Sequence, residues 1–175
     1  MSKILITGAV GFIGTNVTIE AIKRGYTVVG FDNLHRPLTD ENLQVLQKTY
    51  KDKFEFIHGD IRNESDFDRI PEVVGAIHLA GQCGIPYAQI NPRYDFEVNV
   101  LGTINVLETS RFNGKFPIAF AASNKCYTNI TNIVPVKETK TRYEWSGQLP
   151  SRVWGGFEVV TVDKDYNEPP VAIKE

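Results

Sequence analysis

Residues 3–14 read KILITGAVGFIG, an apolar run that leads directly into three glycines, Gly8, Gly11 and Gly14. At this spacing Gly8 permits a tight strand-to-helix turn, Gly11 lets a pyrophosphate approach the backbone, and Gly14 lets the helix pack close to the sheet. The helix that starts near Phe12 directs free N–H groups and the positive end of its dipole toward the phosphates. Three spaced glycines alone indicate only a turn, but this context predicts a dinucleotide-binding site.

The residues that flank the glycines follow the pattern of a strand, a helix and a second strand. Residues 3–7 and 26–31 predict two buried strands, and the apolar residues between them recur at helical spacing before Gly25. Asp32 closes the second strand, where a carboxylate can accept both hydroxyls of an adenosine ribose and repels a 2′-phosphate. The pattern therefore favours NAD over NADP, although Arg36 nearby leaves NADP open. The alternative role for Asp32 is to cap a helix or a turn.

The composition agrees with one domain of ordinary size, since 42% of the 175 residues are hydrophobic and the net charge is −2. The sequence has no basic stripe and no metal-ligand spacing of cysteines and histidines, so we expect neither a nucleic-acid partner nor a metal site. The N-terminus enters a strand without a signal-like segment and no apolar run is long enough for a bilayer, so we expect no membrane association and a cytoplasmic location. Cys83 and Cys126 are then expected to stay reduced as small buried residues.

A third strand is predicted over residues 54–58, and the run GDIR follows it. The carboxylate of Asp60 is placed to accept the amine of adenine, while the N–H of Ile61 meets a ring nitrogen. The alternative is that Asp60 caps a helix over residues 64–70, and the two roles are compatible.

Residues 75–79 predict a fourth strand, which ends at Leu79 before two small residues, Ala80 and Gly81. Small residues there let the nicotinamide-side ribose and the phosphates lie over the strand end. His78 stands inside this apolar strand, and a histidine so placed is more often packed and hydrogen-bonded than catalytic. We therefore expect a structural role for His78.

A long helix is expected over residues 93–113, because its apolar residues recur at helical spacing and Asn91-Pro92 marks its start. Asn99 interrupts this pattern, which indicates a bound water or a backbone carbonyl near the reaction centre, or else a solvent-facing position. Residues 117–122 predict a fifth strand, and Ser123 lies at its end. The apolar stripe of the helix consists of Phe96, Val100, Ile104, Leu107 and Phe112.

Together these runs resemble the N-terminal part of the extended short-chain dehydrogenase/reductases, and within them the NAD-dependent nucleotide-sugar epimerases and dehydratases. The resemblance implies a three-layer α/β Rossmann fold with a parallel sheet in the strand order 3-2-1-4-5, truncated after strand five. Within the family, HGDIRN, HLAGQ, SNKCY and ETKTRY resemble the CDP-sugar 2-epimerases. The matching runs are TGAVGFIG at 7–14, FDNL at 31–34, HGDIR at 58–62, HLAGQ at 78–82, NPRYDFEVNVLGTINVLE at 91–108 and SNKCYT at 123–128.

The resemblance also implies a role for each matching position. The glycine cluster holds the NAD pyrophosphate, the acidic residue after strand two grips the adenosine ribose, and the residues after strands three and four contact adenine and the nicotinamide side. Ser123 corresponds to the active-site serine or threonine, whose hydroxyl would hydrogen-bond the sugar oxygen that is oxidised. The implied cofactor-binding set is Gly8, Gly11, Phe12, Ile13, Gly14, Asp32, Asn33, Asp60, Ile61, Leu79, Ala80, Gly81 and Asn99.

The chain departs from the family in one functional respect. Family members use a tyrosine and a lysine four positions later, and the lysine lowers the pKa of the phenol so that it can take the hydroxyl proton. None of the seven tyrosines has lysine at that spacing, and two prolines break the helix that Tyr166 would need. The chain ends before the family's remaining strands and small domain, so we expect NAD binding without turnover.

We therefore expect an NAD-binding domain over residues 1–143 and an atypical tail over 144–175, in which residues 157–162 resemble a strand that pairs with the exposed sheet edge. Two functions stay open. One is an NAD-dependent nucleotide-sugar epimerase that acts on a CDP-linked deoxyhexose when completed, and the other is a non-catalytic NAD-binding module or degenerate remnant. The resemblance also implies that the helix over 93–113 packs between subunits, as in family dimers, and with its partner helix missing we expect a weak homodimer or a monomer with an exposed apolar patch.

Overall fold

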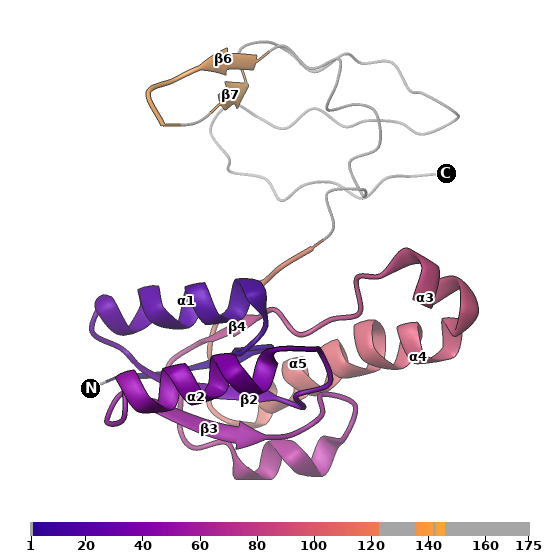
Figure 1. Ribbon diagram of the computed structural model, residues 1–175, viewed down its shortest axis with the longest axis horizontal. Coiled ribbons are helices and arrows are strands. Elements are labelled where there is room, and N and C mark those ends of the chain that lie inside the picture. Colours follow the sequence, from indigo (N-terminus) through magenta and orange to yellow (C-terminus); the bar gives the residue numbers. More distant parts are fainter. Residues whose placement is uncertain (1, 123–135, 142, 146–175) are drawn as a thin grey trace. The chain divides into compact units, whose positions relative to one another are not determined.

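The computed structural model describes residues 2–122, 136–141 and 143–145 (Figure 1). The chain divides into two compact units, Met1–Ala122 and Ser123–Glu175. In the first unit, five parallel strands lie in the order β3-β2-β1-β4-β5. This order and the α/β class confirm the fold expected from the sequence.

The elements of the first unit alternate between strand and helix along the chain. The strands are β1 (Lys3–Thr7), β2 (Thr27–Asp32), β3 (Phe54–His58), β4 (Ala76–His78) and β5 (Ile118–Phe120). The helices are α1 (Phe12–Lys23), α2 (Thr39–Thr49), the 3-10 helix η1 (Glu64–Arg69), α3 (Ile85–Ile90), α4 (Pro92–Phe96), the π turn η2 (Glu97–Leu101) and α5 (Gly102–Phe112).

Two apolar clusters cover the two faces of the sheet, because side chains alternate along each buried strand. In β1, Ile4 and Ile6 point to one face and Leu5 to the other. Helices α1 and α2 close the first cluster, whereas η1 and α5 close the second, which makes three layers. The first cluster contains Ile4, Ile6, Ala9, Val10, Ala21, Ile22, Val28, Leu46 and Phe54, and the second Leu5, Val29, Phe31, Ile61, Phe67, Val73, Ala76, Val98, Val106 and Phe116.

The register brings the carboxyl ends of the strands to a common edge. Thr7, the last residue of β1, is paired with Phe31 of β2 and with His78 of β4. Asp32 is paired with His58 at the ends of β2 and β3. Ligands of open parallel sheets bind outside this edge, at the point where the strand order reverses, which here is between β1 and β4.

Several elements differ from the sequence prediction. Helix α2 was not predicted, because most of its residues are polar and Leu43 and Leu46 are its only apolar residues in the first cluster. The residues expected to form a helix at 64–70 form a 3-10 helix, and β4 and β5 each contain three residues rather than the longer runs expected.

The helix expected over residues 93–113 is divided into α4, η2 and α5, and its apolar stripe lies on the outer side. Its five members, from Phe96 to Phe112, are between 42% and 69% exposed. The buried face instead carries Val98 and Val106 with small or polar residues such as Gly102. A Cβ at Gly102 would lie 2.5 Å from the Ile61 side chain, so the close packing at this position favours glycine.

The second unit contains the antiparallel strand pair β6 (Val136–Glu138) and β7 (Tyr143–Trp145). The expected strand at 157–162 lies outside the described residues, so its pairing with the sheet edge stays a prediction, as does the domain boundary at residue 143. No helix in the described part of the chain is long and apolar enough to cross a membrane.

Candidate functional site

The glycine loop after β1 is a tight turn that only glycine can form at two of its positions. Gly8 has φ +69° and donates its N–H to the carbonyl of Phe31 at 2.8 Å. A Cβ at Gly8 would lie 2.8 Å from the Ala80 nitrogen, and one at Gly14 would lie 1.8 Å from the Gly8 oxygen. Gly11 differs, since its Cβ would meet only the Gly8 oxygen at 3.4 Å, so the space above Gly11 is open.

Helix α1 begins at this open space without a cap. Gly11 occupies the N-cap position, and neither a capping side chain nor an acidic residue is present in the first turn. The first N–H groups of a helix have no partner within the helix, so they and the helix dipole favour an anion there. Phe12 and Ile13 are 86% and 61% exposed, and Thr15 Oγ1 is the one buried side-chain oxygen or nitrogen in the described chain that lacks a partner. The loop therefore fits a pyrophosphate.

Asp32 lies beside this loop at the end of β2. Its Oδ1 accepts the N–H of Leu34 at 2.9 Å, and its Oδ2 accepts the N–H of Val10 at 3.4 Å. Burial raises the pKa of the Asp32 carboxyl, and these backbone hydrogen bonds oppose the rise. The turn-capping alternative for Asp32 is thus present in the structure, while two carboxylate oxygens that each hold only a backbone donor keep capacity for hydroxyl groups.

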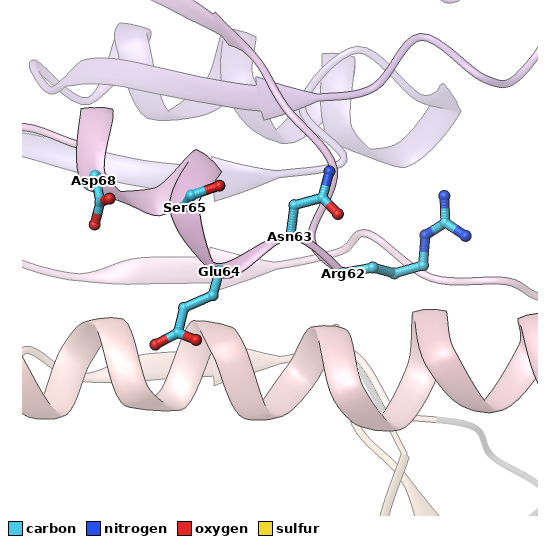
Figure 2. A pocket seen from close by; sticks show the side chains of 5 residues that line it. All are labelled: Arg62, Asn63, Glu64, Ser65 and Asp68. Carbon is cyan, nitrogen blue, oxygen red and sulfur yellow. The ribbon is translucent and has the colours of Figure 1, made fainter.

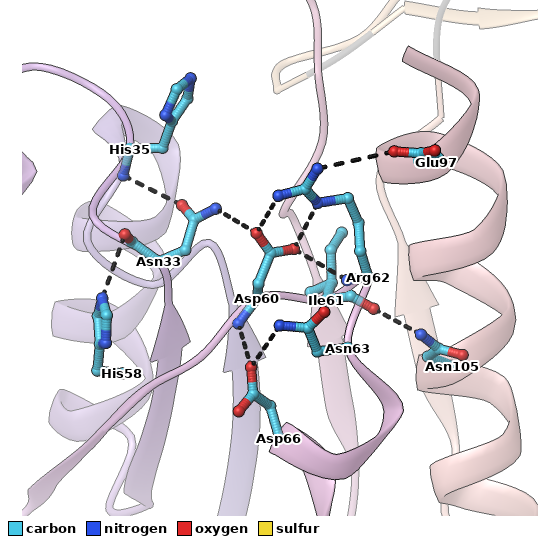
Figure 3. A network of polar contacts seen from close by, with 10 residues as sticks. All are labelled: Asn33, His35, His58, Asp60, Ile61, Arg62, Asn63, Asp66, Glu97 and Asn105. Carbon is cyan, nitrogen blue, oxygen red and sulfur yellow. Dashed lines mark hydrogen bonds and ion pairs between the residues drawn. The ribbon is translucent and has the colours of Figure 1, made fainter. Parts of the chain in front are cut away.

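Asp60 is held by a network at the end of β3 (Figure 3). Its Oδ1 accepts the backbone N–H and the Nε–H of Arg62, both at 3.0 Å, and its Oδ2 accepts Arg62 Nη2 at 2.8 Å and Asn33 Nδ2 at 3.0 Å. Four donors fill the roughly four acceptor positions of a carboxylate. An adenine amine at Asp60 would therefore have to replace one of them, and the adenine contact stays a prediction.

Arg62, the main donor to the Asp60 carboxylate, is itself held in place by neighbouring residues. The guanidinium of Arg62 lies over the ring of Tyr94, 4.8 Å from its centroid, and also faces Glu97 at 3.8 Å. The helix-capping role proposed for Asp60 is wrong, because η1 has Asn63 at its N-cap and no side-chain cap. The N–H of Asp60 instead donates to Asp66 Oδ2 at 2.9 Å.

Two hollows border this network. One, of about 410 Å³, lies against the ends of β2 and β3, and the other, of about 540 Å³, opens beside η1 (Figure 2). Neither hollow is lined by residues of the glycine loop. The first hollow is lined by Asn33, His35, His58, Gly59, Asp60, Arg62, Asn63, Asp66 and Tyr94, and the second by Arg62, Asn63, Glu64, Ser65 and Asp68.

Asn99 fixes the loop that follows β4. Its Oδ1 accepts the N–H of Gln82 at 2.8 Å, and its Nδ2 donates to the carbonyl of Gln82 at 2.9 Å and to Asp95 Oδ1 at 3.2 Å. A Cβ at Gly81 would lie 3.2 Å from Asn99 Oδ1, so a small residue is needed there. Of the roles predicted for Asn99, the structure shows the hydrogen bond to a backbone carbonyl, that of Gln82.

The loop after β4 carries two further contacts that sequence reasoning missed. Arg36 donates to Gln82 Oε1 at 2.7 Å and lies 3.6 Å from Cys83 Sγ. Cys83 is exposed, so the prediction that it is buried is wrong: it sits on a loop rather than in the sheet. No spacing rule in the sequence links Arg36 to a residue so distant along the chain.

The strand ends thus bring most predicted site residues to one edge of the sheet, on β1, β2, β3 and β4. Gly8, Asp32, Asp60 and Ala80 each follow or close one of these strands. Ser123 and Cys126 lie outside the described residues. No group of three or more histidine, cysteine or acidic residues in the described part of the chain is arranged to hold a metal ion.

Comparison with known proteins agrees with this geometry. The family described as GDP-mannose 4,6 dehydratase matches residues 5–147. CDP-paratose 2-epimerase of Salmonella typhi is 40% identical over 147 residues, which are 81% of this chain and 42% of that protein. The chain spans about two fifths of the length of the curated relatives it matches.

Solved structures show the same relationship. The UDP-glucose 4-epimerase of Thermus thermophilus in complex with NAD is 30% identical with a TM-score of 0.58, over 69% of this chain and 37% of that one. The UDP-glucose 4-epimerase of Thermotoga maritima with UDP-glucose is 29% identical with a TM-score of 0.60, over 69% and 38% of the two chains. The family match covers most of the sequence, and the chain therefore belongs to the GDP-mannose 4,6-dehydratase family of NAD-dependent nucleotide-sugar epimerases and dehydratases.

Proposed function

We propose that this chain forms the NAD-binding part of a nucleotide-sugar epimerase whose substrate is a CDP-linked deoxyhexose. The observation that carries the proposal is the uncapped N-terminus of α1 above the open face of Gly11, with the Asp32 carboxylate beside it. These features suit a pyrophosphate and an adjoining ribose. The CDP-sugar assignment is supported by the likeness to a CDP-paratose 2-epimerase.

When bound, NAD supplies a hydride acceptor that can return the hydride to the sugar. The first turn of α1 binds the phosphates through N–H groups, and Asp32 orients the adenosine ribose. Asn99 holds the backbone of Gln82 and so shapes the side of the site nearest β4. We assign Ser123 to a hydrogen bond with the reacting sugar hydroxyl.

A second candidate function is a non-catalytic NAD-binding module. The observation that favours it is the absence of a tyrosine followed by lysine four positions later anywhere in the 175 residues. Without that pair the chain lacks the base that takes the hydroxyl proton. Epimerisation of a CDP-deoxyhexose by the purified chain would reject the module. NAD binding without turnover is expected of both candidates, and a neighbouring reading frame that encodes a tyrosine-lysine helix would then favour the epimerase.

Calorimetric titration with NAD and NADP tests cofactor binding. We expect NAD to bind, NADP to bind more weakly, and Asp32→Ala to weaken NAD about tenfold, because a hydrogen bond to a charged group is worth about 1.5 kcal/mol or more. Asp52→Ala, which removes an exposed carboxylate from the turn before β3, is the matched control and should leave NAD affinity unchanged. Absence of binding by the unaltered chain would reject the proposal.

We further propose that the outer stripe of α4, η2 and α5 forms a weak homodimer interface. Its apolar residues, from Phe96 to Phe112, are exposed and follow one helical segment. Sedimentation of the unaltered chain should show association that rises with concentration, and Ile104→Glu should abolish it. Val45→Glu on α2, at a similarly exposed position, is the control and should leave it unchanged. A monomer at all concentrations would reject the interface.

The cytoplasmic location expected from the sequence stays a prediction.

A further inference from the structure

A buried chain of polar side chains runs from β1 through β4 to the helical segment behind the site. His78 is 2% exposed, and Thr7 is fully buried. His78 Nδ1 lies 2.6 Å from Thr7 Oγ1, and its Nε2 lies 3.1 Å from Thr103 Oγ1. Apart from these bonds, the imidazole packs against the Phe120 ring, with centroids 5.5 Å apart.

The hydrogen bonds at the two ends of this row of polar side chains fix where its protons lie. Thr103 donates its hydroxyl to the carbonyl of Asn99 at 2.6 Å, so its oxygen can only accept from His78 Nε2. Thr7 Oγ1 accepts the N–H of Ala80 at 3.2 Å, and its hydroxyl proton is left for His78 Nδ1. The imidazole is therefore neutral and carries its proton on Nε2. Burial lowers the pKa of His78 to about 4, in agreement with this state.

The residues that bond the two ends of this row, Ala80 and Asn99, both belong to the half of the site nearest β4. Ala80 follows β4, and Asn99 holds the backbone of Gln82 in the same loop. Asp32 places the adenosine ribose at β2, so a dinucleotide that crosses the glycine loop extends its nicotinamide half toward β4. We propose that His78 is a positioning residue, which couples the Asn99 turn to Ala80 and thereby sets the nicotinamide half of the site.

The positioning role of His78 rests on the proposed function, which is NAD binding. The test is therefore designed so that failure of the positioning role can be told apart from failure of NAD binding. NAD and ADP are titrated in parallel, because ADP carries the adenosine ribose and both phosphates but no nicotinamide. We expect Thr103→Val, which removes the hydroxyl that accepts from His78, to weaken NAD about fivefold, the effect of losing about 1 kcal/mol, and to leave ADP affinity unchanged.

A second threonine of α5 provides the matched control. Thr109 donates its hydroxyl to the carbonyl of Asn105 at 2.7 Å, the same helical bond that Thr103 makes with Asn99, but it does not contact His78. Thr109→Val should leave the ratio of NAD to ADP affinity unchanged. An unchanged ratio in Thr103→Val as well would overturn the positioning role, whereas no NAD binding by the unaltered chain would overturn the proposed function and, with it, this inference.

Variants of His78 and a spectrum of the imidazole complete the test. His78→Gln retains a side-chain N–H in reach of Thr103 and should restore part of the NAD affinity that His78→Leu loses. The ¹⁵N spectrum of the unaltered, cofactor-free chain should show one neutral imidazole protonated on Nε2 that does not titrate between about pH 5.5 and 8. A proton on Nδ1, or titration in that range, would overturn the inference whatever the cofactor affinity.

Discussion

Gly14→Ala is expected to destabilise the folded chain by about 3 kcal/mol or more and to abolish NAD binding. The added Cβ would lie 1.8 Å from the Gly8 oxygen and 2.8 Å from the carbonyl carbon of Ala9. These are backbone atoms of a turn that the Gly8 N–H bond to Phe31 holds in place, so they cannot move aside as a flexible side chain would. Urea denaturation followed by circular dichroism measures the loss.

Gly11→Ala is the matched control for this substitution. Its Cβ would lie 3.4 Å from the Gly8 oxygen, and the φ angle of −68° suits alanine. The variant should therefore fold with nearly unchanged stability, yet its methyl group occupies the space assigned to the pyrophosphate and should weaken NAD strongly. Equal stability of the two variants would contradict the packing argument, and unaltered NAD affinity in Gly11→Ala would contradict the placement of the phosphates.

Asp60→Asn is expected to lower the free energy of unfolding by about 2 kcal/mol at neutral pH. Burial raises the pKa of Asp60, but the hydrogen bonds from Arg62 and Asn33 outweigh it and lower the pKa from 3.8 to about 2. The amide would turn an N–H group toward one pair of these donors and remove the charge that pairs with Arg62, whose remaining ion pair is the longer contact to Glu97.

The pH dependence of this loss gives a second measurement. The folded pKa lies below the unfolded value, so the carboxylate contributes its full stability above about pH 4, and the contribution disappears as the pH falls toward 2. The difference in unfolding free energy between the unaltered chain and Asp60→Asn should therefore shrink over this interval. Asp52→Asn, at an exposed position, should follow the unaltered chain throughout. A difference that stays constant with pH would show that the carboxylate charge is not the cause.

The buried strands and the glycine loop could be predicted because both depend on local chemistry, whereas the strand order followed from the resemblance to the family. The buried strands are apolar and β-branched, and the spacing of Gly8, Gly11 and Gly14 has one common structural solution. The helical packing could not be predicted in the same way. The periodicity of Phe96 and Ile104 marked one apolar face of this helix, but the buried face is formed by Gly102 with Val98 and Val106, and the fit of Gly102 to Ile61 depends on a segment distant in sequence.

The polar contacts of the site were also only partly predictable. The sequence marked Asn99 as a polar residue that interrupts an apolar pattern, and Asp60 as a candidate to contact adenine or to cap a helix. Their partners, Arg62 for Asp60 and the Gln82 backbone for Asn99, follow from three-dimensional placement. His78 was expected to be packed and hydrogen-bonded, and this prediction is confirmed, but Thr7 and Thr103 carried no signal of their role.

The π turn η2 changes the relative orientation of two residues that contact the loop after β3, Tyr94 and Gly102. In a uniform α-helix Tyr94 and Gly102, eight positions apart, would be rotated by about 80° from one another. A turn closed by i→i+5 bonds contains more residues, so each residue advances the rotation by less, and the wider turn removes much of this offset. Tyr94 can then stack on Arg62 while Gly102 packs on Ile61, the preceding residue. A regular helix would instead point Tyr94 and Gly102 in directions about 80° apart.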